Sequence, residues 1–181
     1  MAEEPIVWID CEMTGLDLST DHIIELAILI TDGQLNVIAE GPELIIHYPK
    51  EVMDNMNEWC INQHGQSGLT SAVLASTVTV SEANTEIMNF LRKHIKTPKI
   101  APLAGNSVHV DKTFLAKEFP DLVEFLHYRI IDVSTIKELT RRWYPQIASN
   151  VPKKNPNHRA LDDIKDTIKE LKFYREKVFV A

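Results

Sequence analysis

The segment Ile6-Val-Trp-Ile-Asp10, continued by Cys11 and Glu12, joins a short apolar run directly to two acidic side chains. A run of this kind predicts a buried strand. Side chains at positions i and i+2 of a strand point to the same face, so Asp10 and Glu12 would lie side by side. Two adjacent carboxylates repel each other unless a cation lies between them, and oxygen ligands suit Mg²⁺ or Mn²⁺. The alternative interpretation is that both are solvated residues just beyond the end of a strand.

More strand signals follow in the first half of the chain. Residues 23–31 are rich in Ile and Leu, with Glu25 embedded among them, and Asp32-Gly33 is a hairpin turn signal. Residues 35–39 and 44–48 have further strand character. We therefore expect the chain to open with an antiparallel, three-stranded meander.

The second half of the chain alternates between helical and strand patterns. Thr79 to Glu82 and Thr135 to Glu138 have the form of capping boxes, which begin helices. Helices are expected over 50–61, 69–75, 82–91, 111–118, 121–126, 135–143 and 158–176, a loop over 64–68, and strands over 99–104 and 129–132. This order predicts one α/β domain spanning residues 1–181, with a mixed five-stranded sheet flanked by helices.

The composition of the 181-residue chain, with 44% hydrophobic and 25% charged residues, is that of an ordinary globular domain. Its net charge of -7 argues against a broad basic surface for long duplexes, although metal ions could neutralise a short nucleic acid. No apolar run approaches the roughly 18–20 residues that span a bilayer, so no membrane partner is expected. The two cysteines exclude a disulfide framework and indicate a reducing compartment. We expect a cytoplasmic protein, or a mitochondrial one if the organism is eukaryotic and a transit peptide is absent from this chain.

Three more acidic residues and one histidine could complete a catalytic site. Asp111 follows the Gly105-Asn106 turn, although an Asp at a helix N-terminus is also an ordinary cap. His158 stands between a Pro- and Lys-rich loop and the last helix, which suits a base that must move over a substrate. The alternative is an exposed histidine before a first turn whose acidic residues the helix dipole favours. On a regular helix Asp162, not Asp163, would share a face with His158, so the choice between them depends on where the helix begins.

Taken in order, these signals resemble the DEDDh 3′-to-5′ exonucleases, which have an RNase H-like fold. The shared pattern is Asp-x-Glu on the first strand, an Asp after a central Gly-Asn turn, and His-x4-Asp late in the chain. The resemblance is closest to the oligoribonuclease family and extends over nearly the whole chain. It is carried by residues 8–16, 105–107, 128–129, 132–139, 141–143 and 158–164.

The resemblance implies roles for the residues of the expected metal site. The implied ligands of two divalent ions, Mg²⁺ or Mn²⁺, are Asp10, Glu12, Asp111 and Asp163. Two such ions stabilise the attacking and leaving oxygens of a phosphodiester displacement. His158 would be the general base that deprotonates the attacking water, and its ordinary pKa near 6.5 suits that role.

The resemblance also implies contacts with a very short RNA. Leu16 and Trp59 would bracket its two bases, since base stacking on an aromatic ring is tolerant of sequence. The residues implied around its 5′ phosphate are Ser107, Arg129, Ser134 and Lys137, with His64 and Tyr128 nearby. Tyr128 would come from the second protomer of a homodimer. The alternative for Trp59 and the other aromatic residues is packing in the core. The alternative for Lys137 is a solvated position on a helix surface.

The activity that the resemblance implies is hydrolysis of dinucleotides and very short single-stranded RNAs to nucleoside 5′-monophosphates, from the 3′ end. One alternative is a DEDDh exonuclease acting on longer RNA or DNA 3′ ends, which the implied phosphate cluster would obstruct. Another is an inactive nucleic-acid-binding module of the same fold. The complete set of four carboxylates and a histidine argues against that second alternative.

Overall fold

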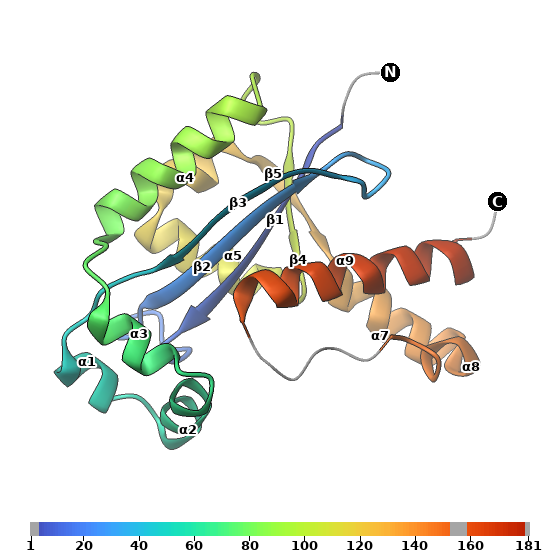
Figure 1. The fold of residues 1–181 in the computed structure, drawn as a ribbon. Helices are drawn as coiled ribbons and strands as arrows, with labels where there is room; N and C mark the ends of the chain where they lie inside the picture. Colours follow the sequence, from blue (N-terminus) through green and yellow to red (C-terminus); the bar gives the residue numbers. More distant parts are fainter. Residues whose placement is uncertain (1–3, 153–158, 180–181) are drawn as a thin grey trace.

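The computed structural model describes residues 4–152 and 159–179, and its centre is a five-stranded mixed sheet (Figure 1). The strands are β1 Ile6–Met13, β2 Ile23–Thr31, β3 Val37–Ile45, β4 Pro102–Gly105 and β5 His127–Asp132, in the spatial order β3-β2-β1-β4-β5. β2 pairs antiparallel with both β1 and β3, whereas β1, β4 and β5 run parallel. The expected mixed sheet of five strands is confirmed.

β1 lies in the middle of the sheet and is buried on both faces. Val7 and Ile9 point into one hydrophobic core, and Ile6 and Trp8 point into a second core on the opposite face. This alternation follows from the two-residue period of a strand. The continuous apolar run before Asp10 is therefore the sequence of a strand covered on both sides.

Helices cover both faces of the sheet (Figure 1). One face is covered by α4 Val80–His94, α5 Val108–Glu118 and α6 Pro120–Phe125, and the other by α7 Val133–Trp143 and α9 Ala160–Lys177. The short α8, Pro145–Ala148, follows α7. Among the described residues, no helix combines the length and the hydropathy needed to cross a membrane.

Three short helices gather beyond the carboxyl end of β1 (Figure 1). They are α1 Lys50–Asp54, α2 Glu58–Gln66 and α3 Leu69–Ala75. A small separate core holds them together and against β2, and it contains Ile24, Met53, Met56, Cys60, Leu69 and Val73. This subdomain places α2 beside the two acidic residues of β1.

Several expected boundaries were wrong. The two strand segments at 35–39 and 44–48 are one strand, β3, because its Gly-Pro pair is tolerated in an edge strand. The helix expected over 50–61 is two helices, since the Asn57 side chain accepts a hydrogen bond from the Cys60 amide and begins α2. The loop expected over 64–68 is also wrong, because α2 continues to Gln66.

The two expected capping boxes had different outcomes. The one between Thr79 and Glu82 is confirmed at the start of α4. The one between Thr135 and Glu138 is wrong, because α7 begins earlier. Its N-terminus is capped by Asp132, whose carboxylate accepts a hydrogen bond from the Ser134 amide at 3.0 Å.

Candidate active site

Three carboxylates from two elements converge at the end of β1. Asp10 and Glu12 come from β1, and Asp163 comes from the first turn of α9. Their potential ligand atoms all lie within 4.8 Å of one another. Asp163, not its neighbour Asp162, belongs to this group. The helix begins at Ala160, and His158, the expected base, lies outside the described residues.

The fourth expected carboxylate, Asp111, lies beside this acidic group. It belongs to the first turn of α5, is buried, and accepts a hydrogen bond from the backbone amide of Cys11 at 3.0 Å. Asp111 thus lies against the backbone between Asp10 and Glu12. Burial and the surrounding carboxylates raise the pKa of the Cys11 thiol well above its usual value. The thiol therefore stays protonated, and the donors of the site are oxygens.

The electrostatics of the group favour a bound cation. Burial, together with the carboxylates of Glu25, Asp163 and Asp111, raises the pKa of Glu12 to about 8, and the Arg159 guanidinium opposes them. Burial likewise raises the pKa of Asp111 to about 7. Confining these negative charges costs free energy in the absence of a counter-charge. A set of carboxylate oxygens therefore fits a hard divalent cation such as Mg²⁺ or Mn²⁺.

A cavity of about 450 Å³ opens directly from this acidic group. Its lining includes Glu12, Leu16, Trp59 and His64. Leu16 is 75% exposed and Trp59 is 68% exposed, so neither belongs to the core. Exposed apolar side chains beside a pocket are typical of a binding site, and a flat apolar ligand would cover them.

The buried His64 side chain lines this cavity. Its Nε2 atom lies 2.9 Å from the backbone carbonyl oxygen of Met13, which follows the acidic residues of β1. Burial lowers the pKa of His64, so its ring is neutral near pH 7. The structure therefore places this residue in the same cavity as Leu16 and Trp59.

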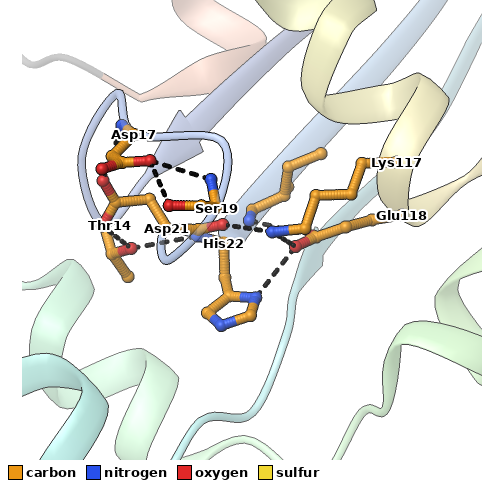
Figure 2. Close-up of polar contacts among 8 residues, drawn as sticks. Thr14, Asp17, Ser19, Asp21, His22, Lys117 and Glu118 are labelled. Carbon is orange, nitrogen blue, oxygen red and sulfur yellow. Dashed lines mark hydrogen bonds and ion pairs between the residues drawn. The ribbon is translucent and has the colours of Figure 1, made fainter.

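The loop that carries Leu16 is held by a network around Asp21 (Figure 2). The Asp21 carboxylate accepts hydrogen bonds from the Thr14 hydroxyl and from the Asp17 amide, each at 2.8 Å. A Cβ atom at Gly15 would lie 2.3 Å from Asp21 Oδ2, so any larger residue here would displace the Asp21 carboxylate from this network. The exposed Leu16 side chain thus projects from an internally bonded turn.

The same loop is attached to the end of α5 (Figure 2). Lys117 Nζ donates to the carbonyl oxygen of Asp21 at 2.8 Å. The Glu118 carboxylate accepts a hydrogen bond from the Ile23 amide at 3.0 Å, and it lies 2.9 Å from Nδ1 of His22. These contacts connect the Leu16 loop to the helix that carries Asp111.

A second polar cluster forms where β4 and β5 end. Ser107 adopts a left-handed backbone conformation, with φ of 52°, and its amide donates to Asp132 Oδ1 and to Ser134 Oγ, each at 2.9 Å. The hydroxyl oxygens of Ser107 and Ser134 are 3.1 Å apart. Ser134 Oγ also donates to Asn106 Oδ1 at 3.2 Å. The structure therefore brings these two expected substrate residues into direct contact.

The other residues expected near the phosphate are less closely connected. Arg129 is exposed on β5, and its guanidinium lies 5.2 Å from the ring centre of Tyr128, which is 72% exposed. Lys137 Nζ lies 3.8 Å from Glu170 Oε1. Within the described part of the chain, neither Arg129 nor Lys137 makes a hydrogen bond to Ser107 or Ser134.

Three residues that support the site were not among the residues predicted from the sequence. Asp21 holds the Leu16 loop. Glu25 binds Arg159 and so holds the start of α9. Glu25 gave a visible signal, because it is an acidic residue in an otherwise apolar strand. Asp21 and Arg159 gave none, since a polar loop residue and an arginine before a helix are ordinary.

The model of the RNase_T exonuclease family matches residues 7–171 of this chain. Among curated relatives, a probable oligoribonuclease of Dictyostelium discoideum is 59% identical over 96% of this chain and 90% of its own length. The mitochondrial oligoribonuclease of Mus musculus is 58% identical over 96% of this chain and 73% of its own. The oligoribonuclease of Rhodococcus jostii is 49% identical over 98% of this chain and 89% of its own.

Solved structures of exonuclease I share the fold. The enzyme from Methylocaldum szegediense has a TM-score of 0.71 at 19% identity, over 96% of this chain and 41% of its own. The E. coli enzyme in complex with a dA16 oligonucleotide has a TM-score of 0.73 at 15% identity, over 97% of this chain and 42% of its own. The chain spans about two fifths of these larger proteins, and the likeness confirms the expected RNase H-like exonuclease fold.

These findings confirm the family resemblance found in the sequence. The family match begins in β1 and ends in α9, so it includes all four expected metal-ligating carboxylates. The identities to the curated relatives, of 49–59%, extend over almost the entire chain. The chain therefore belongs to the RNase_T exonuclease family and, within it, to the oligoribonucleases.

Proposed function

We propose that the protein completes RNA degradation by hydrolysing dinucleotides and very short RNAs to nucleoside 5′-monophosphates, from the 3′ end. Its family is one of metal-dependent exonucleases. One observation carries the proposal: Glu12 belongs both to the acidic group and to the lining of the cavity that Leu16 and Trp59 also line. A base in this cavity would place the adjoining phosphodiester close to the acidic group.

The chain supplies distinct chemical roles at this site. Asp10, Glu12, Asp111 and Asp163 would hold two divalent ions, Mg²⁺ or Mn²⁺. When bound, such ions stabilise negative charge at the phosphate and lower the pKa of water. His158 would accept the proton of the attacking water, since its ordinary pKa near 6.5 lets it act as a base at neutral pH.

Leu16 and Trp59 would hold the bases. Stacking of a base on an aromatic side chain contributes about 1–3 kcal/mol and depends little on sequence. A chain with a net charge of -7 attracts RNA weakly at long range, so affinity must come from local contacts. His64, which forms a wall of the cavity, would shape the space for the base.

The polar cluster at the ends of β4 and β5 would receive the 5′ phosphate. The Ser107 hydroxyl can turn to donate to it, whereas the Ser134 hydroxyl would first have to leave Asn106, and the amides of both residues are already bonded to Asp132. Arg129 and Lys137 would add positive charge from the rim. A closed phosphate site there would favour two nucleotides and obstruct a longer chain.

A homodimer would complete this phosphate site. Tyr128 of the partner protomer would close it, since this side chain is exposed in the single chain. Leu139, Trp143 and Tyr144 are also exposed on and just after α7. Aromatic residues are enriched at protein interfaces, which supports burial of this region between two protomers.

We also propose that residues 1–181 form a single exonuclease domain that works in a reducing compartment. A continuous sheet through β1 to β5 and the family match over 7–171 support one domain. Cys11 and Cys60 are both buried free thiols, which supports a reducing environment.

Hydrolysis of a 5′-labelled diribonucleotide in the presence of Mn²⁺ tests the proposed activity. Asp163→Asn should abolish turnover, because it removes a charged metal ligand. Asp162→Asn is the matched control: it changes the next residue on the same helix turn and should keep near-normal turnover. Normal turnover by Asp163→Asn together with loss in Asp162→Asn would contradict the assigned site.

A further inference from the structure

Glu25 is a carboxylate in the interior of the sheet. Its side chain is 0% exposed, and it lies directly opposite Glu12 in the register of β1 and β2. Arg159 donates to its Oε1 from Nε at 2.9 Å and from Nη2 at 2.7 Å, and a hydrogen bond from the backbone of Ala160 also favours its charged form. A buried charge of this kind depends strongly on its cationic partner, because it has lost its hydration.

Arg159 connects this buried carboxylate to the helix that carries Asp163. It is the residue before α9, and its carbonyl oxygen accepts a hydrogen bond from the Asp163 amide at 2.9 Å. Its guanidinium also lies 3.4 Å from Glu43 on β3. One residue therefore binds the sheet through its side chain and the Asp163 amide through its backbone.

Within the described residues, the side chain of Arg159, the N-cap residue of α9, makes no capping hydrogen bond. The small side chain of Ala160 is buried in the core at the start of the helix. Further along, the helix is held by Ile164, Ile168, Leu171 and Tyr174, which are buried against the sheet. The first turn, which contains Asp163, buries less apolar side chain than the turns that follow, so the ion pair of Arg159 with Glu25 matters most for the position of this turn.

We propose that Arg159, through its ion pair with Glu25, is a positioning residue that holds Asp163 in register with Asp10 and Glu12 for divalent-ion binding. The inference rests on the proposed function, because it assumes that these carboxylates bind the ion. Neither Glu25 nor Arg159 would contact the ion. Their effect is to fix where the first turn of α9 lies relative to the end of β1.

A purely structural ion pair is the competing explanation, and a paired substitution separates the two. Arg159→Met alone leaves Glu25 charged and unpaired, which lowers stability and also adds net negative charge near the ion. The double variant Glu25→Gln/Arg159→Met removes one charge of each sign. The attraction for a cation is then unchanged to first order, and the buried unpaired charge is gone. The charged link between β2 and Arg159 is then lost, whereas the apolar packing of α9 on the sheet remains.

The experiment is a Mn²⁺ titration of the metal-free protein, followed by the electron paramagnetic resonance signal of free Mn²⁺. Thermal unfolding without metal is measured on the same samples. We expect Arg159→Met to lower the melting temperature and the double variant to regain most of it. The double variant should nevertheless bind Mn²⁺ about 10–100-fold more weakly than the wild type, the usual effect of losing a residue that orients a metal ligand. Arg159→Lys, which keeps the charge, should bind Mn²⁺ more tightly than the double variant.

Arg175→Met is the matched control, because Arg175 lies at the other end of α9 and bonds Gln34 from an exposed position. It should leave Mn²⁺ affinity unchanged. Wild-type Mn²⁺ affinity in the double variant would overturn the positioning role. Asp163→Asn, titrated in parallel, identifies which idea has failed. If it too binds Mn²⁺ normally, the proposed metal site is wrong and the inference falls with it. If it loses binding while the double variant does not, only the positioning role is wrong.

Discussion

The buried carboxylates predict that the metal-free protein becomes less stable as the pH rises through neutrality. The Glu12 carboxyl dominates this effect, with its pKa raised from 4.5 to about 8. A carboxyl group whose pKa is higher in the folded state binds its proton more tightly there than in the unfolded chain. Its stabilising contribution is therefore complete below pH 4.5 and is lost as the pH rises through about 8.

The size of this effect follows from the two pKa values. A tenfold change in an equilibrium constant is worth about 1.4 kcal/mol, so the full transition for Glu12 is on the order of 5 kcal/mol. That is a large part of the roughly 5–15 kcal/mol by which a domain is stable. Asp111, with its pKa raised to about 7, adds a contribution of the same sign. A bound divalent cation would remove most of the free-energy cost of ionising these carboxyl groups in the folded protein.

The assay is urea unfolding of the EDTA-treated protein between pH 5 and 8.5, with wild type and Glu12→Gln side by side. The lowered pKa of His64 has the opposite sign and reduces stability toward pH 5, but it is common to both proteins. We expect Glu12→Gln to become the more stable protein as the pH rises, by several kcal/mol at pH 8.5. Excess Mg²⁺ should raise the free energy of unfolding of the wild type at that pH and change that of the variant much less. Parallel profiles for the two metal-free proteins would refute the electrostatic account of the site.

Three other predictions concern catalysis and substrate binding. Trp59→Ala should weaken dinucleotide binding by about 1–3 kcal/mol in calorimetry and leave the melting temperature unchanged, because this side chain is exposed; unchanged affinity would exclude it from the base site. Arg129→Ala should lower kcat/KM much more for a diribonucleotide than for a seven-nucleotide RNA, because a lost charge-assisted phosphate contact costs several kcal/mol. Equal losses would make it a general RNA contact. His158→Ala should slow hydrolysis by about 10²–10⁴-fold and abolish the acidic limb of the pH–rate profile; an unchanged profile would assign that titration to another group.

The architecture was predictable because its main elements depend on local patterns. The apolar run before Asp10 indicated the central strand, and alternating helices and strands indicated the mixed sheet. Boundaries were harder to predict, because they depend on single polar contacts. The Asn57 side chain begins α2, and the Asp132 carboxylate begins α7, and neither contact has a distinctive sequence signal.

The candidate metal ligands could be predicted from their order along the chain. The residues that hold these ligands in place could not. Asp10 and Glu12 stand two residues apart on a strand, and Asp163 has a fixed spacing from His158. Glu25 and Arg159 are 134 residues apart, and only the folded chain brings them together. The left-handed conformation of Ser107 is likewise set by its tertiary hydrogen bonds.

The most direct test of the proposed function is the turnover of two-, three- and seven-nucleotide RNAs, measured side by side with saturating Mn²⁺. The structure places an apolar cavity beside the acidic group, and the proposal adds a phosphate site that ends the substrate after two nucleotides. We predict that kcat/KM is highest for the dinucleotide and falls as the RNA lengthens. A seven-nucleotide RNA degraded as efficiently as the dinucleotide, or more so, would contradict the account.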